Sequence, residues 1–202
     1  MKNMIKDALI LFAITLVAGV LLGAVYQITK EPIARQEALA LENACKEVFA
    51  DAVSFEEDAF DAEAVNAFLA DNGYNAQVIE SVYLAKDGAG AVMGAVLTVK
   101  TSEGYGGDIR FTMGIRNDGT LNSISLLTIS ETPGLGMNAE AVLVPQFVNS
   151  KGYPFVVTKT QSTDAMEISA ISGATITSEA VTGGVNAGML YFTENMMEGG
   201  NS

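Results

Sequence analysis

The chain has 202 residues, of which 49% are hydrophobic and 17% are charged, and its formal net charge is −13. This length suits one globular domain plus an anchor, and the acidic balance argues against nucleic acid or an anionic membrane surface as a partner. There is no His or Trp, and Cys45 is the single cysteine. A catalytic imidazole, a His-ligated metal, an internal disulfide and a Cys-x-x-Cys pair are therefore excluded. The chemistry has to come from carboxylates, hydroxyls, backbone groups or an organic cofactor.

The N-terminal part of the chain contains a long apolar segment. No charged residue lies between Ala8 and Ile28, and a helix of this length spans about 31 Å, close to the hydrocarbon thickness of a bilayer. Pro32 is expected to interrupt the helix just beyond the segment. The alternative is a cleaved signal peptide, but its apolar region is usually shorter, about 7–15 residues, and ends in an Ala-x-Ala-like site that we do not find here. We therefore predict a retained single-pass anchor in residues 1–30 and one domain in residues 31–202.

The charges that flank this segment favour neither orientation strongly. Lys2 and Lys6 precede the segment, and Lys30 and Arg35 follow it. Because the basic residues are nearly balanced, charge alone favours a cytoplasmic N-terminus only slightly.

Two helical stretches are expected between the anchor and the first strand. From Ile33 to Ala52 apolar residues recur at helical spacing, which predicts an amphipathic helix with Cys45 buried on its apolar face. The acidic residues that follow lack the spacing and the turn glycine of an EF-hand loop, so a solvated helix face is the preferred interpretation. These residues are Glu56, Glu57, Asp58, Asp61 and Glu63.

The middle of the chain has the pattern of two β-hairpins. Val78–Ala85 and Ala91–Lys100 flank a turn at residues 86–88, and Ile109–Arg116 and Leu121–Ile129 flank a turn at residues 117–120. Both turns contain the Asp-Gly pair that favours hairpins.

The last third of the chain mixes both kinds of element. Ala139–Asn149 is expected to form a short helix, Phe155–Thr158 and Met166–Ala170 to form strands, and residues 178–197 to form a helix. The tail, residues 198–202, is expected to be frayed. The predicted fold class is α+β, an antiparallel sheet flanked by helices and preceded by one transmembrane helix.

Three segments are rich in small residues beyond what packing explains. They are residues 104–107, residues 130–136 and residues 172–178. The third joins a strand to a helix start, where free backbone N–H groups and the positive helix end favour an anion such as a phosphate. Thr177 or Ser178 is expected to cap that helix, with Glu179 in its first turn. The alternative is that these residues are only caps and turn residues.

The same segments resemble the motifs of FMN-binding domains. Residues 172–175 match the Ser-Gly-Ala-Thr core at which a flavin transferase attaches FMN to threonine, although Ser169 stands where the fuller pattern has Asp. Residues 131–136 match the Glu-Thr-Pro-Gly-Leu-Gly element of these domains, and residues 104–109 resemble their Gly-Tyr-x-Gly-x-Ile segment. Behind an N-terminal anchor, this order is similar to the G subunit of the Rnf ion-translocating ferredoxin:NAD⁺ oxidoreductase. It is similar, more distantly, to the C subunit of the Na⁺-translocating NADH:quinone reductase.

The resemblance implies a role for each matching residue. Thr175 is expected to carry FMN as a phosphoester. The phosphate and ribityl chain are expected to lie among Ser172, Gly173, Ala174, Ile176 and Thr177. The isoalloxazine ring is expected to be approached by Glu131, Thr132, Gly134, Leu135 and Gly136, and less closely by Tyr105, Gly106 and Gly107.

The resemblance also implies an electron-transfer subunit of a membrane complex. Its partners would be the other subunits and, during maturation, a flavin transferase, and its domain would lie outside the cytoplasm. Neither a catalytic residue nor a metal site is expected. Two alternatives remain open from the sequence: a stand-alone extracytoplasmic flavin reductase, and a membrane-anchored binding module without a cofactor.

Overall fold

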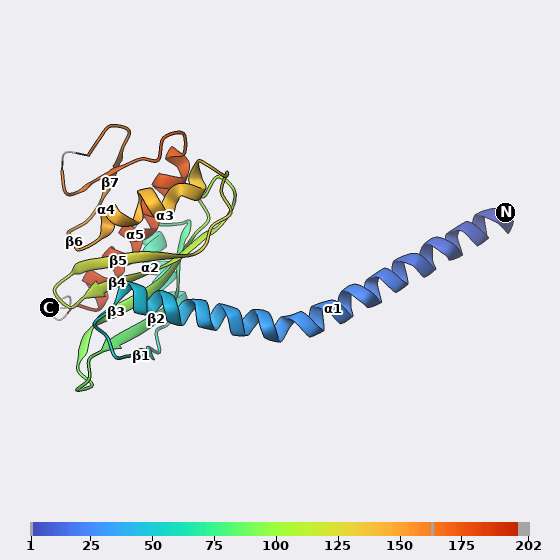
Figure 1. Ribbon diagram of the computed structural model, residues 1–202, viewed down its shortest axis with the longest axis horizontal. Coiled ribbons are helices and arrows are strands. Elements are labelled where there is room, and N and C mark those ends of the chain that lie inside the picture. The colour runs from blue at the N-terminus through green and yellow to red at the C-terminus, as the bar shows by residue number, and fades with distance from the viewer. Residues whose placement is uncertain (1, 163, 198–202) are drawn as a thin grey trace. The chain divides into compact units, whose positions relative to one another are not determined.

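A computed structural model describes residues 2–162 and 164–197, so the tail that we expected to be frayed lies outside the described residues. The chain divides into two compact units, Met1–Ala40 and Leu41–Ser202. The elements, coloured along the chain in Figure 1, are α1 (Lys2–Val48), β1 (Ser54–Glu57), α2 (Ala62–Asp71), β2 (Gln77–Lys86), β3 (Val92–Thr101), β4 (Ile109–Arg116), β5 (Thr120–Thr128), η1 (Gly136–Asn138), α3 (Ala139–Val142), α4 (Val144–Phe147), β6 (Ser150–Lys151), β7 (Val156–Thr158), β8 (Glu167–Ser169) and α5 (Thr175–Asn195).

The helix α1 contains the predicted apolar segment. It is the helix, among the described residues, that is long and apolar enough to cross a membrane, and none of its most apolar stretch is buried. Pro32 lies inside α1, so the expected interruption at this residue is wrong. Proline removes one backbone hydrogen bond and crowds the preceding turn. The Ala, Glu, Gln and Leu residues that follow are good helix formers, and they carry the helix past it.

The strands β1 to β6 form one antiparallel sheet in sequence order, as Figure 1 shows for the strands side by side. The two predicted hairpins are confirmed, with Lys86 opposite Val92 in the first and Ile115 opposite Leu121 in the second. Neighbouring strands joined by short turns need no crossover, which is why alternating patterns and Asp-Gly turns predict this part of the fold.

Different helices cover the two faces of this sheet. Successive side chains of a strand point to opposite faces. In β3, Val99 belongs to the main core together with Val185 of α5. Val96 instead packs in a second cluster with Cys45 of α1 and with Phe49, which directly follows α1. Cys45 is 3% exposed, so the prediction of a buried thiol is confirmed.

The acidic stretch after α1 differs from the expectation. Glu56 and Glu57 belong to β1, which pairs with β2, so a helix across the whole stretch is wrong. Asp61 instead begins α2, because its side chain accepts hydrogen bonds from the N–H groups of Glu63 and Ala64, both at 3.1 Å. An N-cap of this kind fixes where a helix starts and leaves the preceding residues free to pair as a strand.

The last third of the chain follows the expectation with two refinements. The short helix expected within Ala139–Asn149 is present as the two single-turn helices α3 and α4, with Pro145 at the start of α4. The two expected strands, β7 and β8, pair in parallel and form a separate two-stranded sheet. The long helix α5 begins at Thr175, three residues earlier than expected. The α+β class with an antiparallel sheet is thus confirmed.

Candidate functional site

The three segments of small residues lie together around one cavity of about 550 Å³. They are the β3–β4 loop, the loop after β5 and the β8–α5 loop, which come from distant parts of the sequence. The volume falls in the range of small-molecule sites. The cavity is lined by Tyr105, Glu131, Thr132, Leu135, Gly136, Gly173, Ala174, Thr175, Ile176 and Thr177.

The start of α5 forms one wall of this cavity. Ala174 is the N-cap residue, and it makes no side-chain capping bond, so the expected capping by Thr177 or Ser178 is wrong. Both residues lie inside the first turns. Ser178 Oγ donates to the carbonyl of Ala174 at 2.9 Å and accepts from the N–H of Ile171 at 3.0 Å. No acidic residue lies in the first turn. The N–H groups that begin this helix of 21 residues have no side-chain cap among the described residues, and the first residues of the helix line the cavity.

The two threonines at this helix start have different surroundings. The Thr175 side chain is partly exposed on the cavity wall, and its hydroxyl has no hydrogen-bond partner among the described residues. Thr177 is 1% exposed, and its Oγ1 donates to Glu131 Oε2 at 3.1 Å. The hydroxyl of Thr175 is thus available to a ligand, whereas that of Thr177 is already bonded.

Glu131 joins all three loops. Its side chain accepts one hydrogen bond from the backbone N–H of Gly106 at 3.2 Å and the other from Thr177. A Cβ at residue 106 would lie 2.0 Å from the carbonyl oxygen of Ser130. Only glycine therefore allows the β3–β4 loop to approach the loop after β5 so closely.

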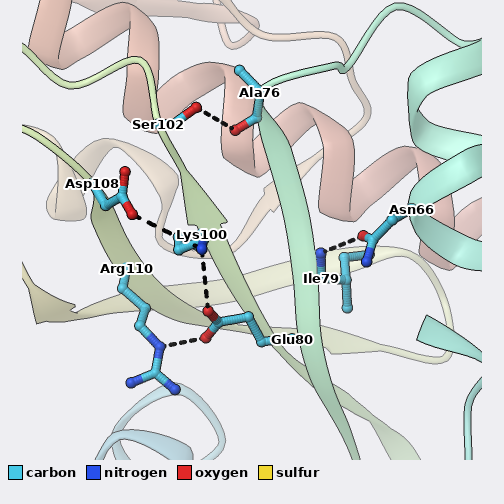
Figure 2. Close-up of polar contacts among 8 residues, drawn as sticks. All are labelled: Asn66, Ala76, Ile79, Glu80, Lys100, Ser102, Asp108 and Arg110. Carbon is cyan, nitrogen blue, oxygen red and sulfur yellow. Dashed lines mark hydrogen bonds and ion pairs between the residues drawn. The ribbon is translucent and has the colours of Figure 1, made fainter. Parts of the chain in front are cut away.

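The base of the β3–β4 loop is held separately from its tip, as Figure 2 shows. Ser102 donates twice to the carbonyl of Ala76, through its N–H at 3.0 Å and through its hydroxyl at 3.4 Å, and Figure 2 draws the second of these bonds. Lys100 lies 3.9 Å from Asp108 across the ends of the loop. Lys100 also lies 4.0 Å from Glu80, which accepts a hydrogen bond from Arg110. These contacts fix the two ends of the loop and leave its middle, with Tyr105, beside the cavity.

The loop after β5 is a tight turn that projects a hydrophobic side chain. The N–H of Leu135 donates to the carbonyl of Thr132 at 3.1 Å, with Pro133 and Gly134 between them. Gly134 has a φ of 77°, as the third residue of a type II turn requires. The turn places Thr132 and Leu135 on the cavity wall, and the Thr132 hydroxyl has no partner among the described residues.

Most of the residues singled out from the sequence line the cavity, and four do not. Ser172, Gly134, Gly106 and Gly107 lie in the same three loops but are not on its wall. Sequence reasoning missed the links through Glu131 and the burial of the Thr177 hydroxyl. The glycines at positions 104, 106 and 136 were the available signal, since closely packed loops need them.

Ser169 lies at the end of β8, where its side chain supports the neighbouring loop. Its Oγ accepts a hydrogen bond from the N–H of Ser162 at 2.9 Å. Its backbone N–H and carbonyl are both bonded to the side-chain amide of Gln146, at 2.8 and 3.1 Å. Position 169 therefore joins α4 to the strand that leads into the cavity.

Two family models match the chain. The "RnfG N-terminal region" matches residues 1–48, and the "FMN-binding domain" matches residues 104–189. The second match spans the three loops and most of α5.

Several relatives align along most of the chain. The chain is 35% identical over 188 residues to the G subunit of the Na⁺-translocating ferredoxin:NAD⁺ oxidoreductase complex of Acetobacterium woodii, covering 92% of this chain and 89% of that one. It is 33% identical over 188 residues to the G subunit of the proton-translocating ferredoxin:NAD⁺ oxidoreductase complex of Clostridium ljungdahlii, covering 89% and 90%. The crystal structure of Shewanella oneidensis NqrC aligns with a TM-score of 0.46 at 17% identity, covering 73% of this chain and 81% of that one.

Proposed function

The chain belongs to the G subunits of ion-translocating ferredoxin:NAD⁺ oxidoreductase complexes, and we propose that it relays electrons in such a complex through FMN attached covalently to Thr175. FMN supplies reversible electron uptake when bound. The chain supplies the attachment point, the surroundings of the ring and the anchor. The match to FMN-binding domains favours this role over a binding module without a cofactor.

The observation that carries the attachment site is the difference between the two threonine hydroxyls. A phosphoester requires a hydroxyl that a transferase and its flavin substrate can reach. The hydroxyl of Thr175 is on the cavity wall without a partner among the described residues, whereas that of Thr177 is buried and donates to Glu131. This supports attachment at Thr175.

The start of α5 suits the phosphate. The uncapped N–H groups of its first turn and the positive end of its dipole favour an anion, as at many phosphate sites. Gly173 has a φ of 77°, which turns the chain sharply before the helix and leaves no side chain there. Residues 173–177 are therefore proposed to hold the phosphate and ribityl chain, with Ser172 beside them.

The other two loops suit the ring. Leu135 and Tyr105 offer apolar and aromatic surface on the cavity wall, and Thr132 offers a hydroxyl donor. An ester at the phosphate does not alter the ring system, so these neighbours are proposed to tune its potential. We also propose Gly134, Gly136, Gly106 and Gly107 as residues that permit the close approach of these loops.

The attachment is tested by co-expressing the full chain with a flavin transferase. The wild-type protein is expected to gain the mass of FMN less one water and to show flavin fluorescence that survives denaturation. Thr175→Ala is expected to lose both while remaining folded, and Thr175→Ser, which keeps a hydroxyl, is expected to retain measurable attachment. Fluorescence that persists in Thr175→Ala would place the attachment elsewhere.

The role of Thr132 is tested by potentiometric titration of the flavin. A hydrogen bond that strengthens as the ring gains electrons favours the reduced form, and bonds to charged groups are worth about 1.5–3 kcal/mol. Thr132→Val is therefore expected to lower the midpoint potential while FMN stays attached. Thr132→Ser, which keeps the hydroxyl, is the control. Identical potentials in all three proteins would leave Thr132 no role at the ring.

We propose that α1 anchors the chain in the cell membrane with Met1 inside and the domain outside the cytoplasm. The apolar segment within residues 1–30 supports the anchor, and the orientation rests on the resemblance, because the flanking charges are balanced. C-terminal reporter fusions test it. Alkaline phosphatase fused there is expected to be active and a cytoplasmic fluorescent reporter to be dark, and the reverse pattern would contradict this orientation.

A further inference from the structure

We infer that Glu131 is the positioning residue of the cofactor site, where its buried carboxylate ties the three loops together and sets the flavin's midpoint potential low. This inference rests on the proposed function, because it concerns the same cavity. Glu131 would hold the three loops in place as well as approach the ring.

The carboxylate sits where the three loops meet. It accepts a hydrogen bond from the N–H of Gly106 in the β3–β4 loop at 3.2 Å. It accepts another from the hydroxyl of Thr177 at the start of α5 at 3.1 Å. Its own backbone belongs to the loop after β5. Both distances lie within the ordinary range for hydrogen bonds. One side chain therefore couples the positions of Tyr105, Thr132 and Thr175.

The packing around Glu131 is close on two further sides. A Cβ at Gly104 would lie 2.8 Å from Glu131 Oε1, and a Cβ at Gly136 would lie 2.7 Å from Glu131 Cβ. The side chain thus has little freedom to leave its place. It is 7% exposed, and it also lines the cavity.

Among the described residues, Glu131 has no Lys or Arg partner. No salt bridge in the part of the chain that the structure describes involves Glu131, and no Lys or Arg lines the cavity. A buried carboxylate bonded only to neutral donors costs desolvation free energy that an apolar residue would not. Packing alone therefore does not explain why a carboxylate, and not an apolar side chain, occupies position 131.

An uncompensated negative charge beside a flavin has a definite effect on its electron affinity. An added electron is repelled by the carboxylate, and the repulsion is strong where water is excluded. The protein's charges near the ring are one of its means of tuning a flavin. The carboxylate therefore opposes reduction and lowers the midpoint potential.

The test uses the full chain loaded with FMN and compares Glu131→Gln with Glu140→Gln. The amide keeps the volume of the side chain and can still accept the N–H of Gly106, but it removes the charge. Glu140 is exposed in α3 and lines no part of the cavity. Its amide variant has the same net charge as Glu131→Gln and therefore controls for the loss of one charge away from the cavity. We expect Glu131→Gln to carry FMN to the wild-type extent and to have a higher midpoint potential than Glu140→Gln.

Two further variants separate charge from packing. Thr177→Val removes one hydrogen bond and leaves the charge, so its potential is expected not to rise. Glu131→Ala removes both bonds. Its FMN content is expected to fall by about tenfold or more, and its unfolding midpoint is expected at a lower urea concentration. Partial recovery of FMN content in Glu131→Gln relative to Glu131→Ala is the expected rescue.

The outcomes separate this inference from the proposed function. Wild-type protein without covalent FMN would overturn both. Loaded wild type with equal potentials in Glu131→Gln and Glu140→Gln would overturn the role of the charge alone. A rise in Thr177→Val as large as that in Glu131→Gln would assign the effect to loop packing instead, and full FMN content in Glu131→Ala would remove the tying role.

Discussion

The two long helices, α1 and α5, each contain a long apolar stretch, and these stretches have opposite surroundings. Between Met4 and Ile28 the large hydrophobic side chains of α1 are exposed, with Leu22 at 73%. In α5 most residues from Thr177 to Phe192 are buried. An apolar helix without a polar face needs apolar surroundings on every side. The domain provides them for α5, whereas α1 requires a bilayer.

Glycines show the same contrast. Nothing lies within 4 Å of a Cβ built at Gly19 or Gly23 of α1. In α5, a Cβ at Gly184 would lie 2.9 Å from the ring of Phe111, and one at Gly188 would lie 2.3 Å from Met113 Sδ. The sheet therefore fits against α5 because these positions lack side chains. Glycines in α5 thus allow close packing against the sheet, whereas Gly19 and Gly23 in α1 have open space around them.

The largest effect is expected from placing charge in the apolar segment of α1. Arginine at the centre of a membrane helix costs about 2.5–3.5 kcal/mol per residue, so Leu16→Arg combined with Val17→Arg is expected to release the protein from membranes. Carbonate extraction followed by fractionation measures this. The circular dichroism of the domain is expected to be unchanged, and Leu16→Ala with Val17→Ala is the apolar control. Undiminished membrane retention of the arginine variant would contradict a lipid-facing α1.

The reciprocal effect is expected from truncating a ring beneath α5. Phe111 is fully buried, and replacing such a residue by alanine costs about 3–5 kcal/mol. Phe111→Ala is expected to lower the free energy of unfolding by that amount without changing membrane retention. Phe12→Ala, at a position 63% exposed, is expected to leave urea unfolding of the domain unchanged. Equal losses of unfolding free energy in Phe111→Ala and Phe12→Ala would contradict the difference in burial between α5 and α1.

A smaller effect is expected from adding one methyl group to each helix. The Cβ of Gly184→Ala meets Phe111 at 2.9 Å, and overpacking of this kind costs about 1–3 kcal/mol. Gly19→Ala meets nothing, and alanine favours helix over glycine, so no loss is expected. Urea unfolding of both variants, with membrane retention as a second measurement, checks the pair. A stable Gly184→Ala would mean that the sheet and α5 are less closely packed than described.

Local pattern was enough to predict much of the fold. The two hairpins follow from alternation and Asp-Gly turns, and the anchor follows from one uncharged run. The errors fall where local signals compete. Pro32 does not end α1, Asp61 and not the acidic composition decides where α2 begins, and α5 starts at Thr175. At α1 and α2 the deciding signals are local ones that composition alone did not reveal: the helix formers after Pro32 and the N-cap at Asp61.

The candidate site was predicted as three separate motifs, but its assembly was not. Spacing along the chain does not reveal that Glu131 bonds both Gly106 and Thr177. The contacts join residues 25 and 46 positions apart. Nor does it reveal that the hydroxyls of Thr175 and Thr177 differ in access, because both occur in the same short run. Hydrogen bonding between loops is a property of the folded arrangement.

The smallest effect is expected from an exposed charge pair, because neither of its side chains is buried as those of α5 are. In the turn between β4 and β5, Asp118 accepts hydrogen bonds from Lys151 Nζ at 2.9 Å and from the N–H of Thr120 at 3.0 Å. These bonds hold the pKa of the Asp118 carboxyl well below its usual range, the bond to Lys151 having the largest influence. A depressed folded pKa stabilises the protein above the unfolded value of about 3.9, and the contribution is lost as the pH falls further.

Asp118→Asn is therefore expected to unfold slightly earlier in urea than the wild type at pH 7, and by less than Gly184→Ala. The difference is expected to shrink as the pH falls below about 4 and as salt is added, because both partners are more than half exposed. Asp71→Asn, at the exposed end of α2, has the same net charge and controls for the overall balance. If Asp118→Asn lowered the free energy of unfolding as much as Phe111→Ala does, buried apolar contacts would not be the main source of the domain's stability. An effect that persists unchanged at low pH would contradict the ionised pair, since the carboxyl would then contribute equally when protonated.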